Sequence, residues 1–269
     1  APTVIWIILG GIFIGGVHDM FTLVASIRHH GRSIAEVIKE YKSKKAFIIF
    51  LIFLWISIIY VITAFTDITA GTFADPARGA GVASSSMMYL LLALIMGIIL
   101  RVFKPPLSIS TFIFMPLVLV CIWLGPKFPL NLRPLFGMDL RMTWDVLLLG
   151  YCFIAAVIPV WLLLQPRGYL GGFFLTLTAG ASLLGIIVGH FTQKLVINFP
   201  AFTGWVNPGG LPLFPLLFTT VACGACSGFH ALVSSGTTSK QISMEPDAKV
   251  IGYGGMLLES FVAITALGT

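Results

Sequence analysis

The stretch PLFPLLFTTVACGACSGFHALVSSGTT, from Pro212 to Thr238, decides how this chain folds. It is apolar enough to enter a membrane, yet small and polar residues recur along it at spacings of three and four, which place them on one stripe of a helix. The members of this stripe are Thr219, Cys223, Ser227, His230 and Ser234. Polar groups in a membrane span are costly unless they face the protein interior or a water-filled path. The stripe is therefore the first candidate for a transport site.

Glycines and prolines accompany the stripe. Gly224 and Gly228 remove bulk where a ligand or a neighbouring backbone could approach. Together with two prolines near the start of the stretch, they loosen or break a helix. In many transporters, interrupted spans expose half-helix dipoles and bare backbone groups to substrate. We therefore predict a broken helix near 212–234, and we assign Ser235, which follows the stripe, to the same substrate path.

The composition places the whole chain in a membrane. Hydrophobic residues make up 58% and charged residues 10% of the chain, and the mean hydropathy is +1.01; a soluble domain has about 25% charged residues. No run of like charges suggests a nucleic-acid surface, so the lipid bilayer and not a nucleic acid is the expected partner. The net charge of +6 is attributed to loop lysines and arginines that set orientation. Four cysteines lie in apolar segments, which favours buried thiols over disulfides.

Eight segments are long and apolar enough to cross a bilayer as helices of about 20 residues. They are 3–26, 46–66, 86–103, 107–124, 145–164, 170–190, 212–234 and 249–267. The predicted fold class is all-α, a polytopic transmembrane helix bundle that forms a single domain over 1–269. Six lysines and arginines in the loop 28–45 mark it as cytoplasmic, so alternation puts both chain ends on the outer side.

Two loops are predicted to have structure of their own. The string SIAEVIKEYKSKK within the loop 28–45 indicates an amphipathic helix, with Ser33 as N-cap and Glu36 completing a capping box. This helix lies along the membrane surface or serves as a solvent-facing connector. The segment 191–211 is rich in proline and glycine, which predicts a structured outer loop with turns.

The first span combines a packing motif with an ionisable pair. Gly11 and Gly15 form a GxxxG pair, which lets another helix approach closely. His18 and Asp19 follow within the same apolar run, where an ionisable pair is costly unless it is paired or hydrated. The pair serves either as a cation or proton relay, or as a buried pair that meets a neighbouring helix end or a nearby arginine.

Two further carboxylates are candidates for cation coupling. Asp67 lies with Thr69 and other threonines at the outer end of the second span, where hard oxygen ligands would suit Na⁺; a helix cap is the alternative. Glu259 has mostly apolar residues and glycines around it. A lone intramembrane carboxylate suggests proton coupling or a salt bridge to a partner helix.

A metal site and an enzyme are both disfavoured. Cys223, Cys226 and His230 could share a helix face, but C-x-x-C spacing without a second ligand pair is weak evidence for zinc. Small residues that permit helix contact explain the same letters. We expect neither a metal nor another cofactor, and no HExxH-type motif indicates a catalytic site.

Several strings together resemble one protein family. GGVHDM, SIRHHGRSIAEVIKEY, the FTD that ends at Asp67, the long string from Pro212 and GYGGMLLESFVA are similar to the carbon starvation protein family, CstA. The resemblance follows the chain in order from the first span to the last. It implies a multi-pass inner-membrane secondary transporter that takes up peptides or pyruvate during carbon starvation. It also implies the LeuT-like inverted repeats and broken-helix site of the amino acid–polyamine–cation (APC) superfamily.

The leading hypothesis is a symporter that moves a small peptide or carboxylate with H⁺ or Na⁺. The stripe, its glycines and Ser235 would bind substrate, and the cation would be handled by His18, Asp19, Asp67, Thr69 and Glu259. Members of the family usually carry further helices on both sides of the matching region, so the chain is expected to be incomplete relative to the family. The alternatives are a non-transporting membrane subunit or sensor, or a fragment that needs another chain or a second copy to complete the site.

Overall fold

The computed structural model describes residues 2–134, 137–193, 200–206 and 210–268. Regular structure in these ranges is helical, apart from an isolated bridge between Val206 and Pro212. The all-α prediction is confirmed. Parts of the loop predicted at 191–211 lie outside the described residues, so that loop stays a prediction.

Seven helices among the described residues are long and apolar enough to cross a membrane. They are Pro2–Arg28, Lys44–Phe73, Gly79–Val102, Leu107–Lys127, Leu140–Val157, Leu164–Thr192 and Lys249–Gly268. The chain is an integral membrane protein. Each of these helices overlaps one of the predicted spans. The remaining predicted span, 212–234, is not one continuous helix but is divided into three short helices.

One predicted span is displaced along the sequence. In place of 145–164, the structure has α7 (Leu140–Val157). The helix begins earlier because Asp139 caps it, accepting a hydrogen bond of 2.8 Å from the Met142 backbone N–H. It ends at Val157 because Pro159 lacks the N–H that would continue it and restricts the residue before it.

The chain divides into two compact units. The first unit is Ala1–Phe53 together with Ala179–Thr269, and the second unit is Leu54–Thr178. Two long helices, α4 (Lys44–Phe73) and α8 (Leu164–Gln193), contribute to both units.

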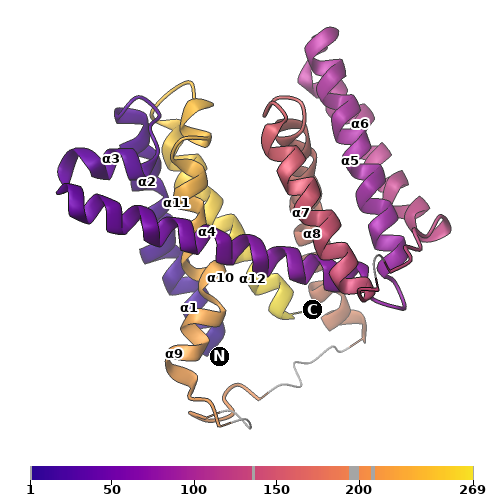
Figure 1. The fold of residues 1–269 in the computed structure, drawn as a ribbon. Helices are drawn as coiled ribbons and strands as arrows, with labels where there is room; N and C mark the ends of the chain where they lie inside the picture. Colours follow the sequence, from indigo (N-terminus) through magenta and orange to yellow (C-terminus); the bar gives the residue numbers. More distant parts are fainter. Residues whose placement is uncertain (1, 135–136, 194–199, 207–209, 269) are drawn as a thin grey trace. The chain divides into compact units, whose positions relative to one another are not determined.

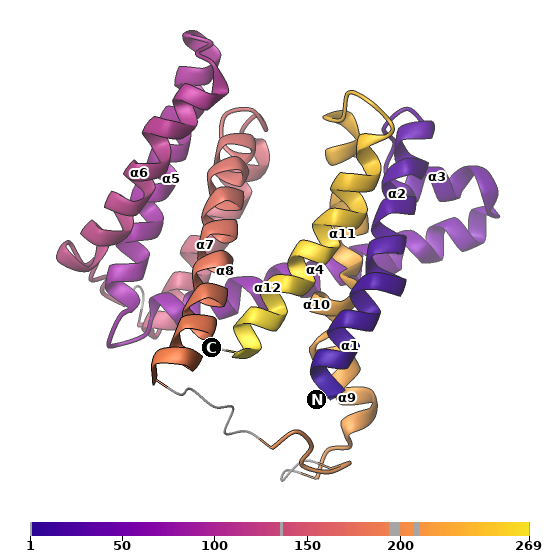
Figure 2. The same ribbon diagram turned by 180° about the vertical axis from the view of Figure 1, so that it is seen from behind.

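The first unit packs both ends of the chain together. Its helices are α1 (Pro2–Gly10), the π-helix η1 (Gly11–Gly15), α2 (Gly16–Arg28), α3 (Ile34–Tyr41), α9 (Leu213–Thr220), α10 (Ala222–Cys226), α11 (Gly228–Ser234), the 3₁₀-helix η3 (Thr238–Lys240), the π-helix η4 (Lys249–Tyr253) and α12 (Gly254–Gly268). Both ribbon views show α2 beside α11 and α12 (Figures 1 and 2). The helix α2 near the N-terminus therefore contacts α11 and α12, which lie about two hundred positions later in the sequence.

The loop after α2 is held by hydroxyl groups. The capping box at the start of α3 is confirmed, since Ser33 Oγ accepts from the Glu36 N–H and Glu36 accepts from the Ser33 N–H. Ser26, which is fully buried, donates to Ser239 Oγ at 2.9 Å. Ser235 Oγ accepts from the Ile34 N–H at 3.1 Å. These bonds fasten the segment that follows α11 to the α2–α3 loop.

The second unit is built on α5 (Gly79–Val102) and α6 (Leu107–Leu124), with the 3₁₀-helix η2 (Gly125–Lys127), α7 and parts of α4 and α8. Two buried apolar clusters hold it together. One consists of Ala70, Phe73, Ala83 and Trp144, and the other of Met96, Phe114, Val118 and Leu170.

Candidate functional site

The predicted interruption in 212–234 is confirmed. The segment forms α9, α10 and α11, with non-helical backbone angles at Val221 (φ −103°, ψ 12°) and Ser227 (φ −66°, ψ 104°). Gly224 and Gly228 lie on either side of Ser227, and glycine has a low helix propensity. The expected stripe is therefore bent at Ser227, and the residues before and after that point have different neighbours.

Neighbouring helices stabilise the interrupted segment. Ser260 of α12 donates a hydrogen bond of 2.8 Å to the Gly224 carbonyl, so a carbonyl beside the break is satisfied. The predicted close packing at Gly15 is confirmed, because an added Cβ there would lie 2.7 Å from the Ala225 carbonyl oxygen. The π-helix η1 therefore packs directly against the backbone of α10.

Three ionisable side chains from three helices meet beside the break. His230 of α11 places Nδ1 2.8 Å from Asp19 Oδ2 of α2, although 211 positions separate the two residues. His230 Nε2 lies 2.7 Å from Glu259 Oε2 of α12, an ion-pair distance without the alignment of a hydrogen bond. The Asp19 side chain is 3% exposed, and its other oxygen, Oδ1, lies 3.1 Å from His18 Nδ1. We call Asp19, His230 and Glu259 the acid–imidazole cluster.

A thiol extends the cluster along α10. Cys223 Sγ donates to Glu259 Oε1 at 2.9 Å and lies 3.7 Å from Ser227 Oγ. Both oxygens of Glu259 therefore have close polar neighbours, and so do both oxygens of Asp19. A connected series of polar groups therefore extends from His18 to Ser227, the non-helical residue between α10 and α11.

The acid–imidazole cluster needs a proton to be stable. If His230 were neutral with Nδ1–H donating to Asp19, the lone pair of Nε2 would face a Glu259 oxygen at 2.7 Å. Two acceptors at that distance repel, so either the imidazole or Glu259 carries a further proton. A site of this kind can bind a proton, release it and pass it between an imidazole and a carboxylate.

A small cavity opens beside the cluster. It has a volume of about 230 Å³ and is lined by Asp19, His230, Ser234, Thr238 and Gly252, with apolar residues of α2, α11 and α12. Sites for drug-sized ligands occupy roughly 300–1,000 Å³. Its volume suits water molecules or an ion better than a peptide.

Comparison with known proteins identifies the family. The family model of carbon starvation protein CstA matches residues 1–269. The chain belongs to the CstA family. No solved structure matches it.

Curated relatives are much longer than this chain. The peptide transporter CstA of Escherichia coli K12 is 38% identical over 99% of the chain, which spans 38% of that protein. The pyruvate/proton symporter BtsT of the same organism is 36% identical over 99% of the chain, which spans 37% of it. The peptide transporter CstA of Mycobacterium tuberculosis H37Rv is 35% identical over the full chain, which spans 35% of it. The chain therefore covers well under half the length of these relatives.

The strings that carry the CstA resemblance supply the acid–imidazole cluster. GGVHDM contributes Asp19, SGFHALVSSGTT contributes His230, and GYGGMLLESFVA contributes Glu259. Asp19 of the His18–Asp19 pair therefore meets an imidazole of another helix and not a nearby arginine. The nearby arginines pair elsewhere, Arg28 with Glu245 and Arg32 with Glu40.

The other residues of the predicted substrate stripe have varied surroundings. Ser227 and Ser234 are buried near the cluster, and Ser234 lines its cavity. Gly224 packs against Ala263, whereas an added Cβ at Gly228 would meet nothing within 4 Å. Thr219 is exposed on α9 and donates to the Leu216 carbonyl of its own helix.

Asp67 and Thr69 belong to the second unit, whereas the acid–imidazole cluster belongs to the first. Asp67 accepts two hydrogen bonds from the Arg141 guanidinium, at 2.8 and 2.6 Å, and Thr69 Oγ1 donates to the Phe65 carbonyl at 2.7 Å. Both side chains therefore have structural partners.

Two polar sets of the structure were not predicted from the sequence. The buried Ser26–Ser239 contact has no sequence signal, because isolated serines are common in membrane helices. Arg167 was not singled out among the lysines and arginines, although it lies in α8 and lines two cavities. Its contacts with Tyr89 and Tyr151 come from other helices, so no local sequence signal indicates them.

Proposed function

We propose that this chain forms part of a secondary transporter of the inner membrane that takes up peptides or a small carboxylate such as pyruvate with a cation. The observation that carries the proposal is the acid–imidazole cluster beside an interrupted helix. Membership of the CstA family supports it, because relatives are named for peptide transport and for pyruvate/proton symport. No enzymatic step is needed.

We favour H⁺ over Na⁺ as the coupling ion. The centre of the cluster is an imidazole, which binds a proton but, once protonated, repels Na⁺. Glu259 and Asp19 supply the negative charge that holds that proton. Thr69 and Asp67, the oxygen ligands predicted for Na⁺, have their partners within the second unit.

Protonation offers a way to move the interrupted helix. His230 joins α11 to α2 through Asp19 and to α12 through Glu259. A proton taken up by Glu259 would replace an ion pair with a neutral contact and weaken the tie to α12. Because α11 follows the non-helical Ser227, it can shift without carrying α10 along.

Uptake into proteoliposomes tests the proposal. Wild-type protein should accumulate labelled pyruvate or a dipeptide when the outside is made acidic, with or without Na⁺. Glu259→Gln and His230→Ala should each abolish accumulation driven by the pH gradient. Glu40→Gln is the matched control, because Glu40 is half-exposed and pairs with Arg32 at the surface.

The outcomes separate the alternatives. Unchanged gradient-driven uptake in both cluster variants would remove the acid–imidazole cluster from the mechanism. Uptake driven by a Na⁺ gradient alone would show that the coupling ion is Na⁺ and not H⁺. Ligand binding without flux in wild-type protein would favour the membrane subunit or sensor.

A further inference from the structure

Arg167 is an arginine of a membrane helix without an acidic partner among the residues that the structure describes. The ion pairs of arginines in those residues join Arg28, Arg32 and Arg141 to carboxylates, not Arg167. Arg167 Nη1 donates a hydrogen bond of 3.2 Å to Tyr151 Oη of α7. A guanidinium has five N–H donors, so most of them are available to a ligand.

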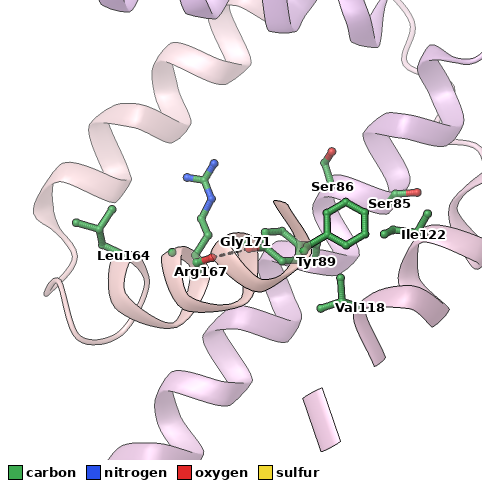
Figure 3. Close-up of a pocket in the computed structure, with 10 residues that line it drawn as sticks. Ser85, Ser86, Tyr89, Val118, Ile122, Leu164, Arg167 and Gly171 are labelled. Atoms are coloured by element: carbon green, nitrogen blue, oxygen red, sulfur yellow. Dashed lines mark hydrogen bonds between the residues drawn. The ribbon is translucent and has the colours of Figure 1, made fainter. Parts of the chain in front are cut away.

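Two cavities of the second unit share this arginine. One has a volume of about 570 Å³ and the other about 540 Å³, and Ser86, Tyr89 and Arg167 line both. Figure 3 shows the Arg167 side chain extending from α8, with Ser86 and Tyr89 supplied by the neighbouring helix. Both volumes lie within the range of sites for small organic ligands.

The backbone of Arg167 is fixed by the helix that faces it. Tyr89 Oη of α5 donates to the Arg167 carbonyl at 2.5 Å, as the dashed line in Figure 3 marks. Gly171 permits this approach, because an added Cβ there would lie 3.1 Å from Tyr89 Oη. Tyr151 holds the guanidinium at its other end. A cation fixed in this way binds a ligand with less loss of side-chain entropy.

We propose that Arg167 is the centre of a binding site for the carboxylate of a small organic acid. A guanidinium matches a carboxylate with two parallel hydrogen bonds. Tyr151 Oη accepts from the arginine, so its own O–H is free to donate to the same carboxylate.

The remaining lining selects for charge and size. Val118, Ile122 and Phe174 make much of the larger cavity apolar, which suits a ligand with a hydrocarbon group. Arg167 is the one cation among the lining residues of either cavity. A single positive charge is fully neutralised by one carboxylate, so a bound monoanion leaves no net charge at the site. Pyruvate and the C-terminal carboxylate of a short peptide share this chemistry.

This inference rests on the proposed function and deepens it, because it assigns the recognition of the substrate carboxylate to the second unit. The acid–imidazole cluster belongs to the first unit and carries two carboxylates, which disfavour a substrate anion. The site at Arg167 supplies the opposite charge.

Equilibrium binding separates this site from transport. Labelled pyruvate is bound to purified protein in detergent, where no gradient acts and no flux is measured. Arg167→Gln should weaken binding by about 10- to 100-fold, the range for a lost hydrogen bond to a charged group. Arg167→Lys should retain part of the affinity, and Tyr151→Phe should weaken binding several-fold. Methyl pyruvate, which has no carboxylate, should fail to compete.

Arg101→Gln is the matched control. Arg101 is another arginine of the second unit, but it lies over the Trp161 ring and lines neither cavity. The Arg101→Gln variant should bind pyruvate with the affinity of the wild-type protein. The variants are first compared by size-exclusion chromatography, and if Arg167→Gln does not fold, the Arg167→Lys and Tyr151→Phe affinities decide.

The results assign each failure to its cause. Binding of pyruvate by Arg167→Gln at wild-type affinity, or equal loss in Arg101→Gln, overturns the site. The site is also overturned if the protein does not bind pyruvate but retains phosphatidylglycerol in nanodiscs in a way that depends on Arg167. The bound anion would then be a lipid headgroup. Arg167-dependent binding without uptake by wild-type protein supports the site while the proposed function fails.

Discussion

A single methyl group added at Gly15 measures how closely α10 depends on the first helical segment. In Gly15→Ala, the new Cβ would lie 2.7 Å from the Ala225 carbonyl oxygen, 2.9 Å from Met256 Cγ and 3.0 Å from Cys226 Cα. All three distances are below the 3.4 Å at which ordinary contact begins. Two of the three atoms belong to the backbone, so they cannot rotate away. Either α10 or η1 must move.

Overpacking of this kind costs about 1–3 kcal/mol. Gly228→Ala is the control with the opposite expectation, because an added Cβ there meets nothing within 4 Å. Alanine also favours helix over glycine by up to about 1 kcal/mol. Thermal denaturation in detergent should therefore show a lower midpoint for Gly15→Ala and no decrease for Gly228→Ala.

Two results would refute this reasoning. The first is a wild-type midpoint for Gly15→Ala, which would mean that α10 is not held against the backbone of η1. The second is an equal decrease in both variants, which would mean that any glycine of the membrane region is intolerant of a methyl group. A displaced α10 should also lower uptake in Gly15→Ala, because α10 carries Cys223 and leads into Ser227.

Three further changes test particular contacts. Ser260→Ala removes the hydrogen bond to the Gly224 carbonyl and should lower stability by about 1 kcal/mol in thermal denaturation; an unchanged midpoint would show that this carbonyl finds another donor. Asp67→Asn should cost no more than about 1 kcal/mol, because its ion pair with Arg141 is half exposed. Its uptake should keep the proton dependence of wild type, and loss of that dependence would return Asp67 to the coupling site. Gly236→Ala places a side chain at φ +91° and should cost about 1–2 kcal/mol by the same assay, whereas stability at the wild-type level would show that the turn can relax.

The sequence predicted the positions of helices better than their ends. Apolar runs of sufficient length mark seven spans, because a membrane requires about 20 such residues. The apolar run from Ile158 to Leu163 extended one predicted span, yet the helix ends at Val157. Pro159 terminates it through a missing N–H, a local effect that the hydropathy of a segment does not register.

An interruption within 212–234 was predicted, but neither its position at Ser227 nor the partners of His230 were. Glycines and prolines weaken a helix locally, so the sequence indicates an interruption without fixing the residue at which it occurs. The contact with Asp19 joins residues 211 positions apart and depends on which helices are neighbours. Helical periodicity gives the face of each residue, not the helix that it meets. For the same reason the sequence did not reveal that Asp67 pairs with Arg141.

Charge explains why substrate and proton should be handled by different residues. With His230 protonated and both carboxylates ionised, the acid–imidazole cluster has a net charge of −1, which disfavours a substrate carboxylate. Two like charges 4 Å apart repel by about 4 kcal/mol at an effective dielectric constant of 20. A substrate carboxylate is therefore better held by Arg167, which has no acid beside it in the described second unit. If this division is correct, Arg167→Gln should change the substrate concentration for half-maximal uptake and Glu259→Gln its proton dependence. The double variant should then show both defects without an additional interaction between them.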